Sequence, residues 1–205
     1  MADRFTAIVC DRAEVAGLTV SDELRDSLAA YLLLLSRWTR KINLTSFDLE
    51  TPTDAAIDRL VIEPLVAAKL VLPTDRFSID IGSGGGSPAI PMRLAQPNLE
   101  TVLVEVRERK AAFLREVTRT LRLGNVHVEA QTFETFAAQS QWHGRADLVT
   151  MRAVRSEAAI WRDARSVVKN SGRVLWFASI GETTKNCGTF VLDQQIDPVA
   201  ILRPI

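Results

Sequence analysis

The stretch FSIDIGSGGGSP, residues 77–88, decides the fold of this chain. Its first five residues predict a short buried strand, and the glycines after them predict a tight turn. A helix over Ile90–Ala95 and a second strand over Thr101–Glu105, which ends in a carboxylate, are expected to follow. In nucleotide-binding folds an acid about 20 residues past such glycines accepts the ribose hydroxyls of an adenosine group. These features predict an adenosine-bearing cofactor on the first two strands of a parallel sheet.

The spacing of the glycines indicates which cofactor is bound. Gly82, Gly84 and Gly86 form G-x-G-x-G just after Asp80, and Ser87 stands where a dinucleotide fingerprint has its third glycine. No phosphate-binding G-x-x-x-x-G-K-[ST] motif occurs in the chain. S-adenosylmethionine has no phosphate, and a backbone without Cβ atoms can approach its methionine and adenosine parts closely. We therefore predict S-adenosylmethionine; the alternative is a turn that only joins a strand to a helix.

Composition limits the class of protein and its partners. The chain has 205 residues, 47% of them hydrophobic, and its 25 basic and 25 acidic residues give zero net charge. This favours one α/β body, with a helical extension over residues 1–72 packed on a cofactor-binding core over residues 73–205. Because the net charge is zero, any contact with RNA must come from a local patch. Cys10 and Cys187 form no C-x-x-C pair, so we expect no metal site and no disulfide framework.

The sequence shows neither a signal-peptide pattern nor a run of apolar residues long enough for a membrane span. The first residues lack the apolar core and cleavage site of a signal peptide. The longest apolar run, Ala29–Leu35, is too short to span a membrane. We expect a soluble cytoplasmic protein without membrane contact.

The periodicity of apolar residues predicts an alternation of strands and helices. Ser21 is the expected N-cap of the second helix, whose apolar stripe runs to Trp38, and Gly17 and Gly124 are expected to end helices. Helices are predicted over residues 3–16, 22–38, 52–70 with a kink at Pro64, 90–95, 108–121 and 156–169. Strands are predicted over 77–81, 101–105, 126–129, 147–150 and 174–178, followed by β-like runs over 189–192 and 198–202. The alternation from 77 to 178 predicts parallel βαβ units.

A cluster of cations lies at the end of the second helix. Arg37, Arg40 and Lys41 complement the negative end of the helix dipole, or they contact phosphates of a nucleic acid. The sequence leaves both interpretations open.

Four stretches of the chain match the motifs of one family. WTRKINLT at 38–45 is similar to W-N-x-x-x-N-L-T, and DIGSGGGSPAIP at 80–91 to D-x-G-S-G-x-G-F-P-G-I-P. RKAAFL at 109–114 is similar to K-R-x-x-F-L, and DLVTMRA at 147–153 to D-x-V-x-S-R-A. On these motifs the chain resembles the bacterial 16S ribosomal RNA guanine-N7 methyltransferases, also known as the glucose-inhibited division protein B family. The likeness covers residues 20 to 178; its glycine loop alone is shared by many methyltransferases.

The resemblance implies a fold and a set of contacts. The fold is a Rossmann-like class I S-adenosylmethionine-dependent methyltransferase, with a mostly parallel sheet, helices on both faces and an N-terminal helical extension. The implied cofactor contacts are Asp80, the loop of Gly82, Gly84, Gly86 and Ser87 at the methionine end, Glu105 at the ribose, Phe133 and Glu134 at the adenine, and Arg152 at the pocket mouth. The implied contacts to RNA are Arg37, Arg40, Lys41 and Asn43. The implied partner is 16S ribosomal RNA or the small ribosomal subunit.

Guanine N7 has a nucleophilic lone pair, so its methylation needs alignment and desolvation rather than a strong base. This suits a chain in which His127 and His143 have no evident acid–base partner and are predicted to be structural or solvated. Arg152 is the candidate catalytic residue, as a group that steadies the nucleobase.

The chain also departs from the family's pattern. The family's R-H-x-x-D-S-L reads R-L-V-I-E-P-L here, with Leu60, Glu63 and Pro64 at the changed positions, and F-P-G reads Ser87-Pro88-Ala89. Thr132 replaces an arginine, and Ser179-Ile180-Gly181 replaces a lysine–glycine pair. Three alternatives therefore stay open: a methyltransferase of a small molecule or a protein, a cofactor-binding module without turnover, and a nicotinamide oxidoreductase. The sequence leaves open the target nucleotide, the choice between naked RNA and assembled subunit, and the oligomeric state, with a monomer favoured.

Overall fold

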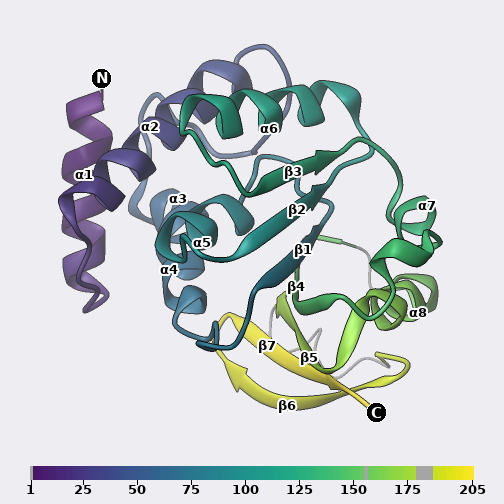
Figure 1. Ribbon diagram of the computed structural model, residues 1–205. Coiled ribbons are helices and arrows are strands. Elements are labelled where there is room, and N and C mark those ends of the chain that lie inside the picture. The colour runs from purple at the N-terminus through teal and green to yellow at the C-terminus, as the bar shows by residue number, and fades with distance from the viewer. Residues whose placement is uncertain (1, 155–156, 179–186) are drawn as a thin grey trace.

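The computed structural model describes residues 2–154, 157–178 and 187–205 (Figure 1). The described strands form a seven-stranded sheet in the order β3-β2-β1-β4-β5-β7-β6. Their bounds are β1 Phe77–Ile81, β2 Glu100–Val104, β3 Val126–Glu129, β4 Ala146–Arg152, β5 Val168–Phe177, β6 Phe190–Ile196 and β7 Val199–Pro204. Strands β1 to β5 pair in parallel, whereas β7 pairs antiparallel with both β5 and β6. The two β-like runs predicted near the C-terminus are thus a hairpin on the edge of a parallel sheet.

Helices cover both faces of this sheet (Figure 1). Their bounds are α1 Ala2–Val15, α2 Asp22–Thr39, α3 Asp54–Ile57, a π turn Asp58–Ile62, α4 Glu63–Ala68, α5 Ala89–Ala95, α6 Glu108–Thr120, α7 Phe133–Ala137 and α8 Ala158–Val167, with a 3-10 turn Ser140–Trp142. One face buries Leu103 of β2 and Leu148 of β4 under α4 to α6. The other buries Val102 and Val149 under α7 and α8, with Trp161 fully enclosed. Alternate residues of the strands thus point to opposite apolar layers, and the predicted α/β class is confirmed.

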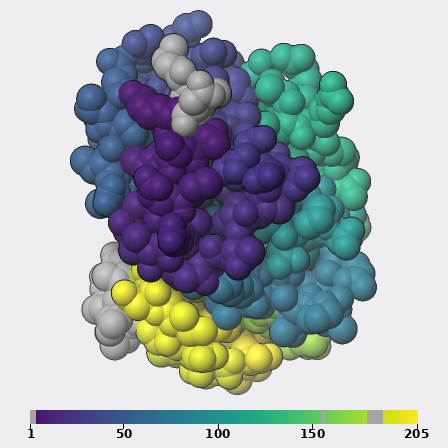
Figure 2. Space-filling model, turned by 90° about the vertical axis from the view of Figure 1, so that its left-hand side faces the viewer, coloured from purple at the N-terminus to yellow at the C-terminus, as the bar shows by residue number. Residues whose placement is uncertain are grey.

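The N-terminal helices pack against the sheet body through one apolar stripe. Leu28, Tyr31 and Leu35 of α2 are fully buried in the same cluster as Phe113 of α6. Ser21 caps α2, as predicted, by accepting a hydrogen bond from the Leu24 amide. Figure 2 shows α1 and α2 side by side on one face of the molecule, above the C-terminal strands. The division into an extension over 1–72 and a core over 73–205 stays a proposal.

Two predicted helix ends are wrong. After α6 the residue with positive φ is Arg122 (φ 53°) and not Gly124, because the helix ends at Thr120 and its first left-handed position falls two residues earlier than expected. The helix α8 ends at Val167 and β5 begins at once, well before the predicted Val174. Gly172 therefore lies inside the strand, where an added Cβ would be 2.7 Å from the carbonyl oxygen of Ala146. The glycine allows close approach of two strands. The predicted helix start at Ser156 lies outside the described residues.

The helix predicted over 52–70 begins at Asp54, after Thr53 as N-cap, and its irregularity is a π turn that ends just before Glu63 and Pro64. The amide of Glu63 donates to the carbonyl of Asp58, five residues back. Pro64 has no N–H to donate. The carbonyl of Leu60 therefore lacks the amide four residues on that an α-helix would provide, and the carbonyl of Arg59 lacks the amide five residues on that a π-helix would provide. Two carbonyl oxygens are thereby available to groups outside the helix.

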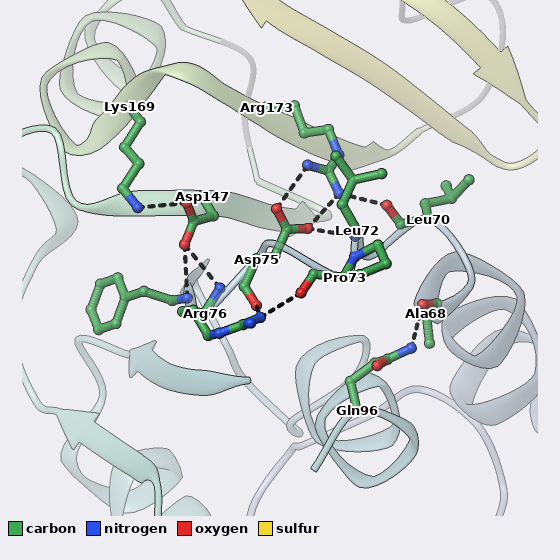
Figure 3. A network of polar contacts seen from close by, with 11 residues as sticks. Ala68, Leu70, Leu72, Pro73, Asp75, Arg76, Gln96, Asp147, Lys169 and Arg173 are labelled. Atoms are coloured by element: carbon green, nitrogen blue, oxygen red, sulfur yellow. Dashed lines mark hydrogen bonds and ion pairs between the residues drawn. The ribbon is translucent and has the colours of Figure 1, made fainter. Parts of the chain in front are cut away.

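A network of ion pairs lies at the end of the sheet where the strands β1 and β4 begin (Figure 3). Arg173 donates to both carboxylate oxygens of Asp75, at 3.2 and 2.6 Å, and each side chain is only 5% exposed. Beside this pair, Asp147 accepts from Lys169 at 2.6 Å and from the amides of Arg76 and Phe77. These contacts tie the segment before β1 to β4 and β5.

Candidate functional site

A cavity of about 410 Å³ lies at the opposite end of the strands, where β1, β2 and β4 end. This volume lies in the range of about 300–1,000 Å³ that is usual for small-molecule sites. Its walls come from three parts of the chain: the glycine loop, the residues after β2 and β4, and the N-terminal segments that cover them. The lining residues are Leu35, Leu44 to Phe47, Arg59, Leu60, Gly82 to Gly85, Ser87, Glu105, Lys110, Arg152 and Ala153. The cavity thus forms where the N-terminal helices meet the sheet.

The glycine loop needs its glycines for conformation and for space. Gly82, Gly84 and Gly86 have φ of 70°, 51° and 87°, which side chains with a Cβ rarely adopt. A Cβ on Gly86 would also lie 2.9 Å from Ile90 Cγ1. Gly86 itself lies behind the cavity wall, and its neighbour Gly85 holds the loop by accepting a hydrogen bond from the Tyr31 hydroxyl at 2.7 Å.

Most amides of the loop already have acceptors inside the protein. Gly82 and Ser83 donate to the Val104 carbonyl at 2.9 and 3.1 Å, and Gly86 donates to Ser83 at 2.6 Å. Gly84 donates to Glu105 Oε2 at 2.8 Å. A pyrophosphate site depends on such amides being directed at the ligand. This loop therefore provides close backbone approach rather than a phosphate cradle.

Glu105 is fixed at the cavity wall. It is 6% exposed, and its two carboxylate oxygens accept from the amides of Gly84 and Arg107, each at 2.8 Å. Each carboxylate oxygen has a further lone pair that can accept from a ligand hydroxyl. The predicted ribose acid is therefore part of the cavity and is held in a defined orientation.

Asp80 lies beneath the loop and not on the cavity surface. Its Oδ1 accepts from the Thr150 hydroxyl at 2.5 Å, while its buried Oδ2 has no partner among the described residues. Burial raises the pKa of Asp80 to about 6. The observed contact of Asp80 joins β1 to β4, so its predicted contact with the cofactor stays a prediction.

Arg152 lines the cavity, but most of its N–H donors already form hydrogen bonds with other groups of the protein. Its Nη2 donates to Glu63 Oε2 at 3.0 Å, and its Nη1 donates to the Ser87 hydroxyl at 3.1 Å and to the carbonyl of Arg59. The guanidinium lies 4.4 Å from the ring centroid of Phe177, and the side chain is 9% exposed. Burial lowers the pKa of Arg152 to about 10, so it stays charged at neutral pH.

The π turn explains two of these contacts. The carbonyl of Arg59 accepts from Arg152, and the carbonyl of Leu60 accepts from the Ser87 hydroxyl at 2.9 Å. These are the two oxygens whose helical partners Pro64 removes. Glu63, in place of the family's aspartate, binds both Arg59 Nη1 and Arg152 Nη2 through Oε2. The departures at positions 63, 64 and 87 thus belong to one contact network in this chain.

Other predicted site residues lie outside the cavity wall. Phe133 is buried against Phe136, and Glu134 is exposed on α7. His143 contacts the Ala137 carbonyl at 2.9 Å, and His127 is exposed beside Glu100. The departure at Ser179-Ile180-Gly181 lies outside the described residues.

The four predicted RNA contacts are exposed and also lie outside the cavity wall. They are Arg37, Arg40, Lys41 and Asn43. The Arg40 Nε donates to Glu50 at 2.7 Å, so a neighbouring carboxylate already balances its charge.

Several lining residues were not singled out from the sequence. They are Thr45 to Phe47, Arg59 and Lys110, which all line the cavity. Thr45 and Lys110 fall inside the quoted motifs, and Arg59 opens the R-L-V-I-E-P-L segment, so the motifs marked the neighbourhood without assigning these side chains.

A model of one protein family, described as rRNA small subunit methyltransferase G, matches residues 24–186. The chain belongs to this family. A ribosomal RNA small subunit methyltransferase G from Burkholderia thailandensis is 31% identical over 176 residues, which cover 84% of this chain and 74% of that protein. The protein of the same name from Stenotrophomonas maltophilia is 35% identical over 163 residues, which cover 78% of this chain and 72% of that protein.

A solved structure shows the same fold at much lower identity. An O-methyltransferase from neocarzinostatin biosynthesis, in complex with S-adenosylmethionine, has a TM-score of 0.56 and covers 68% of this chain and 52% of that chain at 15% identity. Together with the family, this confirms the Rossmann-like methyltransferase fold. The chain is an S-adenosylmethionine-dependent methyltransferase, which contradicts the alternative of a nicotinamide oxidoreductase. No helix in the described parts of the chain has the length and apolarity to span a membrane.

Proposed function

We propose that the protein methylates N7 of a guanine in 16S ribosomal RNA of the small subunit, acting in the cytoplasm as a monomer. The observation that carries the proposal is the cavity at the end of β1, β2 and β4. It combines the fixed carboxylate of Glu105 with three cations, and its described lining contains no histidine. Two relatives named for small-subunit ribosomal RNA methylation are 31% and 35% identical to this chain over 176 and 163 aligned residues.

The residues present fit S-adenosylmethionine on structural grounds. Glu105 offers carboxylate lone pairs for the ribose hydroxyls. Most loop amides already donate hydrogen bonds within the protein, which suits a ligand without phosphate. The positive-φ glycines provide close approach to the methionine part. Asp80, Ser87, Phe133, Glu134 and Arg152 complete the proposed cofactor set.

Bound S-adenosylmethionine supplies an electrophilic methyl group on a sulfonium. Guanine N7 carries its own lone pair, so this chain's residues need only align the base and exclude water. Leu35, Leu44 and Phe47 form the apolar part of the wall. Glu105 is the acid on that wall, and both of its oxygens are engaged by amides. Arg152 acts as a positioning group for the base or the loop.

The proposed RNA contacts lie at the end of α2 and in the segment after it. Arg37, Lys41 and Asn43 are exposed there. Thr45 and Ser46, a few residues further on, line the cavity. A nucleic acid bound along this segment would reach the cavity mouth.

The test is transfer of labelled methyl groups from S-adenosylmethionine into small ribosomal subunits from cells that lack the family's enzyme. We expect label in 16S ribosomal RNA, mapped to one N7-methylguanine. Glu105→Ala should abolish the label. The matched variant Glu108→Gln, at an exposed carboxylate at the start of α6, should retain it. Label that appears only in a protein or small-molecule fraction would overturn the RNA assignment.

A further inference from the structure

The cofactor has one group for which the glycine loop offers little: the α-carboxylate of its methionine part. An anion of this kind needs charged or N–H donors. In the loop, the amides of Gly82, Ser83, Gly84 and Gly86 already donate inside the protein. The amides of Gly85 and Ser87 remain, but they carry no charge, so we seek a charged receptor among the side chains that line the cavity.

Among the described residues, three cations line the cavity, and they differ in how many of their donors are free. Arg152 is 9% exposed and donates to Glu63, to Ser87 and to the Arg59 carbonyl. Lys110 lies on α6, only five residues past Glu105, at the expected ribose end. Arg59 is the cation on the π turn; it lines the same cavity as Glu105, and its side chain is 35% exposed.

Arg59 has donors left to give. Within the described residues its guanidinium makes one hydrogen bond, from Nη1 to Glu63 Oε2 at 2.9 Å. A guanidinium has five N–H donors in a planar fork that matches a carboxylate. The bond to Glu63 fixes the direction of the side chain and leaves Nε and Nη2 for a ligand.

The Glu63 carboxylate and its neighbours also bear on the binding of an anion. Among the described residues, Glu63 is the carboxylate bound by both Arg59 and Arg152. Burial raises the pKa of Glu63, the nearby Asp197 carboxylate adds to this effect, and the two arginines oppose it. An added carboxylate would accept from the unused donors of Arg59 at short range, in a site partly shielded from water.

We propose that Arg59 binds the α-carboxylate of S-adenosylmethionine and that Glu63 is the positioning residue that aims it. Arg59 then holds one end of the cofactor while Glu105 holds the ribose. The sulfonium, which joins the methionine part to the ribose, would then lie between these two contacts. The assignment concerns the bound cofactor alone and does not depend on which acceptor receives the methyl group.

The test compares S-adenosylmethionine with its decarboxylated analogue, by calorimetry on the full chain without RNA. A charge-assisted hydrogen bond contributes about 1.5–3 kcal/mol, or roughly ten- to hundred-fold in affinity. We expect the wild type to prefer S-adenosylmethionine by about that factor. Arg59→Gln should lose the preference by weakening only the carboxylate ligand, Arg59→Lys should restore part of it, and Glu63→Gln should show an intermediate loss.

Lys110→Gln is the matched control, because it removes a positive charge from the same cavity at its other end. It measures the through-space effect of one charge on two ligands that differ in net charge. The change in preference caused by Arg59→Gln must exceed that caused by Lys110→Gln. Equal weakening of both ligands by Arg59→Gln, or no change in either, would overturn the assignment. A wild type that binds both ligands equally would also overturn it, while methylation of RNA, assayed separately, would be unaffected.

Discussion

Arginine–carboxylate clusters lie at both ends of the parallel strands: the cluster where β1 begins is buried, and the cluster where β1 ends is partly exposed. Where β1 begins, Arg173 and Asp75 are each 5% exposed and matched one to one (Figure 3). Their remaining polar atoms bind backbone groups: Asp75 Oδ2 accepts from the Leu72 amide at 2.7 Å, and Arg173 donates to the Leu70 carbonyl at 2.5 Å. The two charges therefore balance each other, and their hydrogen-bond partners all belong to the protein.

Where β1 ends, the cluster leaves hydrogen-bond donors without partners among the described residues. Arg59 and Arg152 share Glu63, and the buried Nε of Arg152 has no partner among the described residues. The side chains of Arg59 and Glu63 are 35% and 22% exposed, and Arg59 lines the cavity. A buried polar cluster that is complete fixes the fold, whereas an incomplete one beside a cavity marks where a ligand completes it.

The largest expected effect comes from opening the complete cluster. Asp75→Ala leaves Arg173 buried without its partner, and the free energy of unfolding should fall by about 3–5 kcal/mol. Denaturant titration measures the loss. The matched variant Asp193→Ala breaks the pair with Arg203, in which both side chains are over 40% exposed, and should cost about 0–1 kcal/mol. Similar losses in the two variants would contradict the contrast.

A second effect comes from Asp80 beneath the glycine loop. Its pKa is about 6 in the folded chain and 3.8 in the unfolded one, so the folded state binds more protons between these values. Its contribution to stability is therefore complete below about pH 4 and is lost as pH rises to about 6, by roughly 3 kcal/mol. Unfolding titrations at several pH values should show this fall in the wild type and a smaller one in Asp80→Asn. Parallel curves for the two proteins would refute the assignment.

A smaller effect should come from the contact that Pro64 makes available. Ser87→Ala leaves the Leu60 carbonyl without its donor and should cost about 1–2 kcal/mol in unfolding free energy. In Pro64→Ala a backbone amide returns, so the same Ser87→Ala change should cost less there. The double-mutant cycle therefore predicts a coupling of about 1 kcal/mol. Additive losses would mean that the two departures from the family's pattern are unrelated.

The sequence predicted the parts of this molecule that depend on local pattern. β1 and β3 have the predicted bounds because each alternates apolar and polar residues over a few positions and is bordered by turn residues. The predicted start of β5 at Val174 is wrong because the strand continues through Gly172, which allows close approach to β4. The bond between Arg152 and Glu63 joins residues far apart in the chain, and its geometry depends on the π turn. No spacing rule shows such a contact.

The smallest effect concerns the cations at the end of α2. If they contact phosphates, Arg37→Gln and Lys41→Gln should each reduce the salt dependence of RNA binding by about one unit of slope. Arg40→Gln should reduce it less, because Glu50 already pairs with Arg40. Binding isotherms at several salt concentrations give the slopes. Three unchanged slopes would return these cations to the role of complementing the helix dipole.

The contrast between the two clusters is tested most directly by two measurements on one protein, Arg59→Gln. Its affinity for S-adenosylmethionine should fall about ten- to hundred-fold, while its free energy of unfolding stays within about 1 kcal/mol of the wild type. That result would show that Arg59 serves a ligand rather than the fold. An unfolding free energy lower by about 3 kcal/mol, with unchanged affinity per folded molecule, would contradict the account.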